Sequence, residues 1–192
     1  TNTRSAQSAV NICWLSGLTK LTLIGTNSLA GNDITSANSF SCGLYCYGAL
    51  SITGGGSLNS IAGNSTLHSA GLFAKDGLTI DSNVQLTVKG DTVAAASGDH
   101  GSYGLLTDGS LNISGASKVD ATGGLANKSY GIYFKTASTI STDGYVRATG
   151  GDLSYAIAAS SGIYADGNLT ISGKGECTAK GGNVSGGATI DE

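Results

Sequence analysis

The fold of this chain is decided by a stretch that recurs, most clearly at residues 129–151, which read SYGIYFKTASTISTDGYVRATGG, and at residues 160–182, which read SSGIYADGNLTISGKGECTAKGG. Each copy holds three short segments with apolar residues at alternate positions, separated by turns rich in Gly, Ser and Asp. Alternation places the apolar residues on one face of a β-strand. A recurring unit of this size is typical of solenoids.

The same unit extends over most of the chain, and its most regular position is a Gly followed by Leu or Ile. Consecutive copies of this step are separated by 28, 33, 27 and 31 residues. The steps are Gly43-Leu44, Gly71-Leu72, Gly104-Leu105, Gly131-Ile132 and Gly162-Ile163. One coil cannot bury its apolar face alone, so the coils must stack. We therefore predict an all-β, right-handed parallel β-helix of about six coils of three short strands.

We expect residues 1–192 to form a single β-helix domain, with residues 26–40 as a longer projecting loop or N-terminal cap region. The chain carries ten Lys and Arg and a net charge of −3. It shows no basic run, which argues against a nucleic-acid partner. No apolar run approaches the about 20 residues of a membrane-spanning helix, so membrane insertion is not expected. The chain starts at Thr1 without an initiator Met, and we expect it to be part of a larger multidomain surface protein.

The cysteines are interpreted from the alignment of the repeats. An offset of 29 residues that superposes Leu21 on Leu50 also superposes Cys13 on Cys42. Stacked residues of adjacent coils lie within the Cα separation that a disulfide requires. The sequence thus predicts a Cys13–Cys42 disulfide or, in the reduced protein, a buried thiol stack. Cys177 falls in an inward column of aliphatic residues and is expected to be buried.

The residue after each Gly-Leu or Gly-Ile pair should face outward, because the aliphatic residue faces inward. These outward positions form one stripe, made of Tyr45, Phe73, Leu106, Tyr133 and Tyr164. Aromatic rings on a rigid surface can stack on sugar rings, so Tyr45, Phe73, Tyr133 and Tyr164 are candidate carbohydrate-binding residues. The alternative is that the rings only pack against one another, as cross-strand aromatic residues do.

Of the turns that follow the Gly-Leu and Gly-Ile steps, three carry an Asp-Gly pair, at Asp76, Asp108 and Asp166. Asp and Gly are ordinary turn residues because both tolerate positive φ. A column of stacked carboxylates would also suit calcium, because a cation offsets their repulsion. Thr136-Ala137 interrupts this column in one coil. Calcium is therefore a weak candidate ligand, and no other cofactor is expected.

The sequence shows no catalytic signature. His68 and His100 lie in different repeats, and most acidic residues stand singly in turns. Arg147 and Asp120 fall one coil apart in an outward column, which favours a surface salt bridge. We therefore predict a non-enzymatic protein, and a polysaccharide lyase or hydrolase is the remaining enzymatic alternative.

The segments at residues 129–151 and 160–182 resemble repeats of large surface proteins of Gram-positive gut bacteria. More distantly, they are similar to the clostridial polysaccharide-binding and calcium-binding parallel β-helix family. The resemblance implies a pectate lyase-like fold and an extracellular location, secreted or attached to the cell wall. It also implies polysaccharide or host glycan as the partner, or the role of an adhesin or structural stalk without a small ligand. The acidic residue that often precedes the family's Gly-Ile step is replaced here by Cys42, Ala70, Tyr103, Tyr130 and Ser161.

Overall fold

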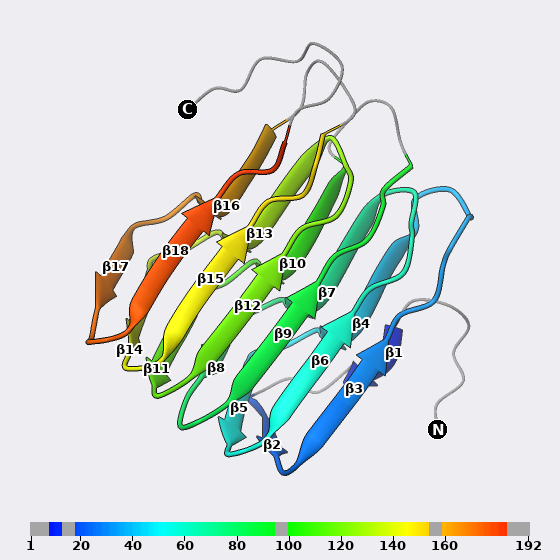
Figure 1. Ribbon diagram of the computed structural model, residues 1–192. Coiled ribbons are helices and arrows are strands. Elements are labelled where there is room, and N and C mark those ends of the chain that lie inside the picture. Colours follow the sequence, from blue (N-terminus) through cyan, green and yellow to red (C-terminus); the bar gives the residue numbers. More distant parts are fainter. Residues whose placement is uncertain (1–7, 13–17, 95–99, 154–158, 184–192) are drawn as a thin grey trace.

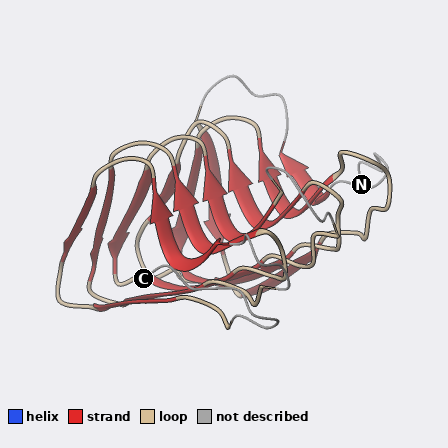
Figure 2. Cartoon of the chain, turned by 90° about the horizontal axis from the view of Figure 1, so that it is seen from above, coloured by secondary structure: helices blue, strands red, loops and turns tan. Residues whose placement is uncertain are grey.

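The computed structural model describes residues 8–12, 18–94, 100–153 and 159–183 of the chain, with only the backbone of residues 8–12. Within these ranges the chain forms eighteen β-strands in three parallel sheets of six strands each (Figure 1). Each coil gives one strand to each sheet in turn, and Figure 2 shows the stacked coils from above. The predicted parallel β-helix is confirmed. The described residues include no helix that is long and apolar enough to cross a membrane.

The three sheets are named here by their order along a coil. Sheet A consists of β1 (Ser8–Ile12), β4 (Phe40–Cys46), β7 (His68–Ala74), β10 (Gly101–Thr107), β13 (Lys128–Phe134) and β16 (Ala159–Ala165). Sheet B consists of β2 (Thr19–Leu23), β5 (Leu50–Gly54), β8 (Leu78–Ile80), β11 (Leu111–Gly115), β14 (Ser138–Thr142) and β17 (Leu169–Ser172). Sheet C consists of β3 (Thr26–Ala30), β6 (Ser57–Ile61), β9 (Gln85–Lys89), β12 (Lys118–Thr122), β15 (Tyr145–Thr149) and β18 (Glu176–Lys180).

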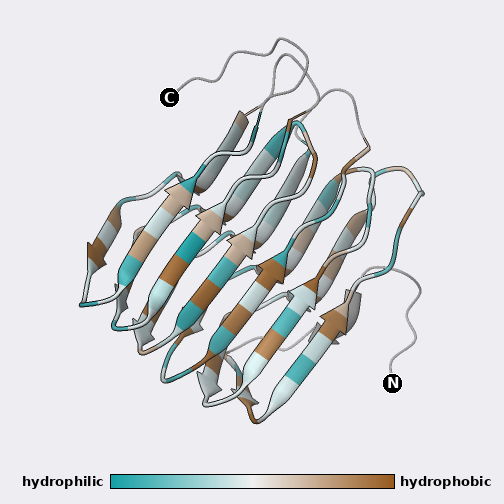
Figure 3. Cartoon of the chain, viewed as in Figure 1, coloured by the Kyte–Doolittle hydropathy of each residue, from teal (hydrophilic) through white to brown (hydrophobic). Residues whose placement is uncertain are grey.

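The core is built from columns of aliphatic side chains that run through the stack. In sheet A, Leu44, Leu72, Leu105 and Ile132 pair in register, and all four are fully buried. In sheet C, the inward column predicted for Leu86, Val119, Val146 and Cys177 is confirmed by the strand register. Figure 3 shows the alternation of apolar and polar residues along the strands of sheet C. Each coil thus covers the apolar face of the next, as a solenoid requires.

The register of the first coil differs from the predicted one. Leu21 pairs with Ile52, and Thr19 pairs with Leu50, so the offset between these strands is 31 residues instead of 29. A shift of two residues leaves every side chain on its own face of the strand, and hydrophobic pattern alone cannot detect it. In sheet A the residue beside Cys42 is Ser8, an offset of 34 residues. The alignment that placed Cys13 beside Cys42 is therefore wrong, and Cys13 itself lies outside the described residues.

The loop predicted for residues 26–40 begins later than expected. Residues 26–30 form β3, and the connection to β4 covers residues 31–39. This strand was not predicted, because polar Asn27 stands where the next coil has the apolar residue Leu58. Its side-chain amide donates a hydrogen bond to the carbonyl of Ser57 at 3.0 Å, which satisfies a polar group at this half-buried position.

A ladder of serines joins the start of five of the six sheet A strands to the turns that leave sheet C. Each serine hydroxyl donates to a backbone carbonyl in the turn of one coil and accepts from a backbone N–H in the turn of the next. For Ser129 the partners are the Gly124 carbonyl and the Gly151 N–H, both at 2.7 Å. The members are Ser41, Ser69, Ser102, Ser129 and Ser160. The ladder fixes the N-terminal ends of the strands of sheet A, whose outer face carries the candidate site.

Candidate functional site

The outward face of sheet A carries the aromatic stripe predicted from the sequence. The register pairs its five members in order along the stack: Tyr45, Phe73, Leu106, Tyr133 and Tyr164. Their exposure varies, because Phe73 and Leu106 are each only 6% exposed whereas Tyr164 is 42% exposed. The stripe is therefore partly covered by other side chains of the same face.

A second row of side chains, which the sequence analysis did not assign to this face, lies beside the stripe. It contains Tyr103 and Tyr130, which precede the glycine of the Gly-Leu and Gly-Ile steps. Tyr130 and Tyr133 are three residues apart, yet their ring centroids lie 5.9 Å from each other. Strict alternation would place such residues on opposite faces, so the alternation is interrupted at Gly131. The signal that was missed is the aromatic residue on both sides of the Gly-Ile step.

The glycines of these steps are required by close packing between sheets A and C. A Cβ atom on Gly131 would meet the backbone nitrogen of Thr149 on β15 and would lie 2.7 Å from the carbonyl oxygen of Gly162. Gly71, Gly104 and Gly162 make equivalent contacts with backbone nitrogens at the ends of other sheet C strands. The glycine column therefore brings the two sheets together directly behind the aromatic face.

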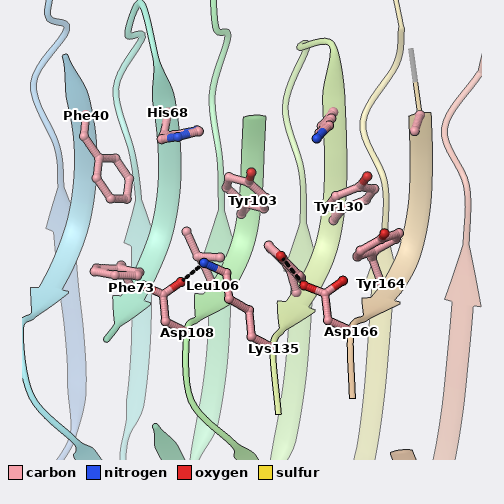
Figure 4. A pocket seen from close by; sticks show the side chains of 13 residues that line it. Phe40, His68, Phe73, Tyr103, Leu106, Asp108, Tyr130, Lys135, Tyr164 and Asp166 are labelled. Carbon is pink, nitrogen blue, oxygen red and sulfur yellow. Dashed lines mark hydrogen bonds and ion pairs between the residues drawn. The ribbon is translucent and has the colours of Figure 1, made fainter. Parts of the chain in front are cut away.

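The two rows enclose a groove of about 660 Å³ on the outer face of sheet A (Figure 4). Its lining residues are Phe40, His68, Phe73, Tyr103, Leu106, Asp108, Lys128, Tyr130, Tyr133, Lys135, Ala159, Tyr164 and Asp166. Phe40 and His68 are the first residues of β4 and β7, and the sequence did not predict that they lie on this face. Leu106 has the smallest side chain of the stripe, so the outer surface of sheet A is recessed between Phe73 and Tyr133.

Gly101 helps to shape the same groove. It lies in register between His68 and Lys128, and a Cβ atom on it would lie 2.8 Å from Cε2 of the Tyr103 ring. The Tyr103 ring therefore lies back over Gly101 and is only 4% exposed. The Gly101 N–H donates a hydrogen bond to Nδ1 of His68 at 3.2 Å, which fixes the imidazole in the wall of the groove.

The rings in the groove hold one another in place. Tyr130 stacks on Tyr164 with centroids 4.7 Å apart and planes inclined by 12°. At the other end, Phe40 contacts Phe73 edge-on at 5.4 Å, and Tyr45 lies 5.1 Å from Phe73. Aromatic pairs in these geometries stabilise a fold beyond the area that they bury. The groove is therefore a preorganised surface.

Charged residues of alternating sign follow the stripe at the turns into sheet B. Because Ala74, Thr107, Phe134 and Ala165 pair in register, the residues after them also stack: Lys75, Asp108, Lys135 and Asp166. Lys135 forms an ion pair with Asp108 at 2.6 Å, and Asp166 accepts a hydrogen bond from the Tyr133 hydroxyl at 2.7 Å. Figure 4 shows both interactions at the edge of the groove.

This register corrects the predicted Asp-Gly column. Asp76 lies beside Gly109, not beside Asp108, since Leu78 pairs with Leu111 across a turn of the same length. Asp108 and Asp166 are separated by Lys135, so the carboxylates do not stack. The premise of the calcium hypothesis is therefore absent. Among the described residues, no group of three or more His, Cys, Asp or Glu side chains is placed to hold a metal ion.

Burial, together with the hydrogen bond to Asp166, raises the pKa of the Tyr133 hydroxyl far above its usual value of about 10. A raised folded-state pKa contributes stability that is fully present below the unfolded-state pKa and is lost as pH rises toward the folded-state pKa. We therefore expect the stability advantage of the protein over Tyr133→Phe to shrink above about pH 10. Urea unfolding of both proteins at neutral and alkaline pH measures this difference. A difference independent of pH would contradict the expectation.

Most of the other predicted residues lie away from the groove. Arg147 and Asp120 pair in register on sheet C, but the guanidinium of Arg147 lies 3.7 Å from the carboxylate of Glu176. Asp120 accepts a hydrogen bond from the Tyr145 hydroxyl at 2.9 Å. Cys42 and Cys46 are buried, and burial raises the pKa of the half-buried Cys177 thiol. Of these residues, Cys42 belongs to the aromatic face, where it packs in one cluster with Ala70 and Tyr103, and the others lie apart from that face.

Comparisons of the chain with protein-family models, with curated proteins and with solved structures give no match. The resemblance to bacterial surface repeats stays a prediction, and the fold and the groove carry the argument for function.

Proposed function

We propose that this β-helix is a non-enzymatic domain that binds polysaccharide or host glycan through the aromatic groove of sheet A. The observation that carries the proposal is the lining of the groove, where aromatic rings lie next to hydroxyl, carboxylate and ammonium groups. Rings can stack on the apolar faces of sugars, and polar groups at the edge can bind their hydroxyls. Concave sites with apolar walls and a few polar groups are typical of ligand sites.

The rigidity of the groove also supports binding. The parallel sheet fixes the backbone of four tyrosines whose rings contact one another: Tyr103, Tyr130, Tyr133 and Tyr164. A surface that is already ordered loses little conformational entropy when a ligand binds. The carboxylates of the groove, Asp108 and Asp166, are engaged by Lys135 and Tyr133, which suits recognition better than proton transfer. The extracellular, cell-surface location is part of the proposal and rests on the resemblance of the repeat.

A glycan array, followed by pull-down on insoluble polysaccharides, tests for binding. We expect the double variant Tyr133→Ala, Tyr164→Ala to bind at least about tenfold more weakly, a loss of about 1.4 kcal/mol. Tyr145→Ala is the matched control, because this half-buried tyrosine lies on sheet C outside the groove. Circular dichroism confirms that each variant is folded. Unchanged glycan binding by the folded double variant would contradict the role of the groove.

A structural stalk is the second candidate, and the contacts among the rings favour it. Phe73 and Leu106 are largely covered, and the Tyr130–Tyr164 stack stabilises adjacent coils. In that case the double variant would lower the melting temperature, and the unmodified protein would bind none of the glycans. Binding and melting measurements on the same samples therefore separate the two functions.

A further inference from the structure

The groove crosses the strands of sheet A along the axis of the solenoid. Its lining residues come from five successive strands of sheet A, namely β4, β7, β10, β13 and β16, and from the turns that follow the last three of them. Neighbouring parallel strands are about 4.8 Å apart, so four such steps span about 19 Å. One ring of a linear glycan has a length similar to one of these steps. The groove therefore has the length of a short oligosaccharide.

Aromatic side chains occur at both ends of this length. Phe40 on β4 lies at one end, and Tyr164 on β16 lies at the other (Figure 4). Between them, Phe73, Tyr103 and Tyr133 contribute rings from each intervening strand. A ligand that lies along the axis therefore passes a ring at every coil, with only the exposed edges of Phe73 and Tyr103 within its reach. A ligand that lies along one strand meets only the rings of that strand and its neighbours.

The charges of the groove balance. Its lining contains two lysines, Lys128 and Lys135, and two aspartates, Asp108 and Asp166. Lys135 and Asp108 are paired with each other, and Asp166 accepts a hydrogen bond from the hydroxyl of Tyr133. An acidic polysaccharide would need an excess of cationic groups to offset its charge. The balance favours a neutral ligand that is recognised by stacking and hydrogen bonds.

We infer that the groove binds a linear, neutral glycan lengthwise along the solenoid axis, with about four sugar rings in contact with successive coils. This inference rests on the proposed function and specifies the class of ligand and its orientation. Each additional ring of the glycan gains contacts with the lining of a further coil until the groove is filled.

Isothermal titration calorimetry with cello-, xylo-, manno- and chito-oligosaccharides, each from the monosaccharide to the hexasaccharide, tests the inference. For at least one series we expect affinity to rise by about tenfold or more between the disaccharide and the tetrasaccharide and then to level off. The affinity should be nearly independent of salt concentration, because screening weakens only interactions between charges.

Variants at the two ends of the groove test the orientation. Phe40→Ala and Tyr164→Ala should each weaken binding of the tetrasaccharide more than binding of the disaccharide, and so reduce the gain in affinity between the two. Tyr164→Ala is the milder change for the fold, because its side chain is exposed. Tyr145→Ala on sheet C should leave the whole series unchanged.

The outcomes separate this inference from the proposed function. If none of the oligosaccharides or polysaccharides binds, both are wrong. If a glycan binds in the groove with an affinity that does not depend on chain length, only the lengthwise orientation is wrong. If acidic polysaccharides bind and salt abolishes the binding, the groove takes a charged ligand and the neutral class is overturned.

Discussion

Replacement of Gly131 by alanine should lower the free energy of unfolding by about 3 kcal/mol or more, the upper range for overpacked interiors. The added methyl group would meet the backbone nitrogen of Thr149 and lie 2.7 Å from the carbonyl oxygen of Gly162 and 2.8 Å from that of Ala121. All three atoms belong to the backbone of neighbouring strands, so no flexible side chain can move aside. The coils would have to separate at the centre of the stack.

Urea unfolding followed by circular dichroism measures this loss, and Gly55→Ala is the control. Gly55 is exposed, and a Cβ atom on it would meet no atom within 4 Å. The control should therefore unfold within about 0.5 kcal/mol of the unmodified protein, as surface substitutions usually do. Similar stabilities for the two variants would show that the sheets are not packed as closely at Gly131 as the structure has them.

Removal of the Ser129 hydroxyl should destabilise the fold by about 2 kcal/mol, because it breaks two hydrogen bonds of the serine ladder. Ser129 is fully buried, and Ser129→Ala would leave the Gly151 N–H and the Gly124 carbonyl without their partner. These two groups belong to the turns of adjacent coils. The variant therefore loosens the connection between one coil and the next.

Ser141→Ala is the matched control for the ladder, since Ser141 is exposed on sheet B. Thermal unfolding of both variants under the same conditions gives the comparison. We expect a clearly lower melting temperature for Ser129→Ala and little change for Ser141→Ala. Equal melting temperatures would mean that a water molecule replaces the serine hydroxyl without loss of stability.

The aromatic face could be predicted from the sequence only in part. The outward stripe from Tyr45 to Tyr164 could be predicted because the alternation after each Gly-Leu or Gly-Ile step is regular. Tyr103 and Tyr130 could not be assigned to the same face, because that requires the alternation to break at the glycine. The alternation breaks because the backbone of sheet C comes close to Gly104 and Gly131. This contact joins segments that are distant in sequence, so the local alternation of residues does not reveal it.

The charged edge of the groove could have been predicted from spacing, because Asp108 and Asp166 follow the glycine of their step by four residues and Asp76 by five. Asp76, Asp108 and Asp166 share an Asp-Gly pair, and a motif alignment places them in one column. The strand pairing instead places Lys75, Asp108, Lys135 and Asp166 in one column, because the paired strand ends fix which turn residues stack. A shift of one residue thus replaces a stack of carboxylates by alternating charges.

The sequence by itself determined the parallel β-helix, its inward aliphatic columns and its aromatic stripe, since each depends on a local period that the chain repeats in every coil. Only the tertiary structure decided the register of the first coil, the second row of tyrosines and the groove between the rows. These features depend on which residues of neighbouring coils and sheets come into contact, and a register shift of two residues leaves the hydrophobic pattern unchanged. The groove exists because packing at the glycine column brings both tyrosine rows to one face.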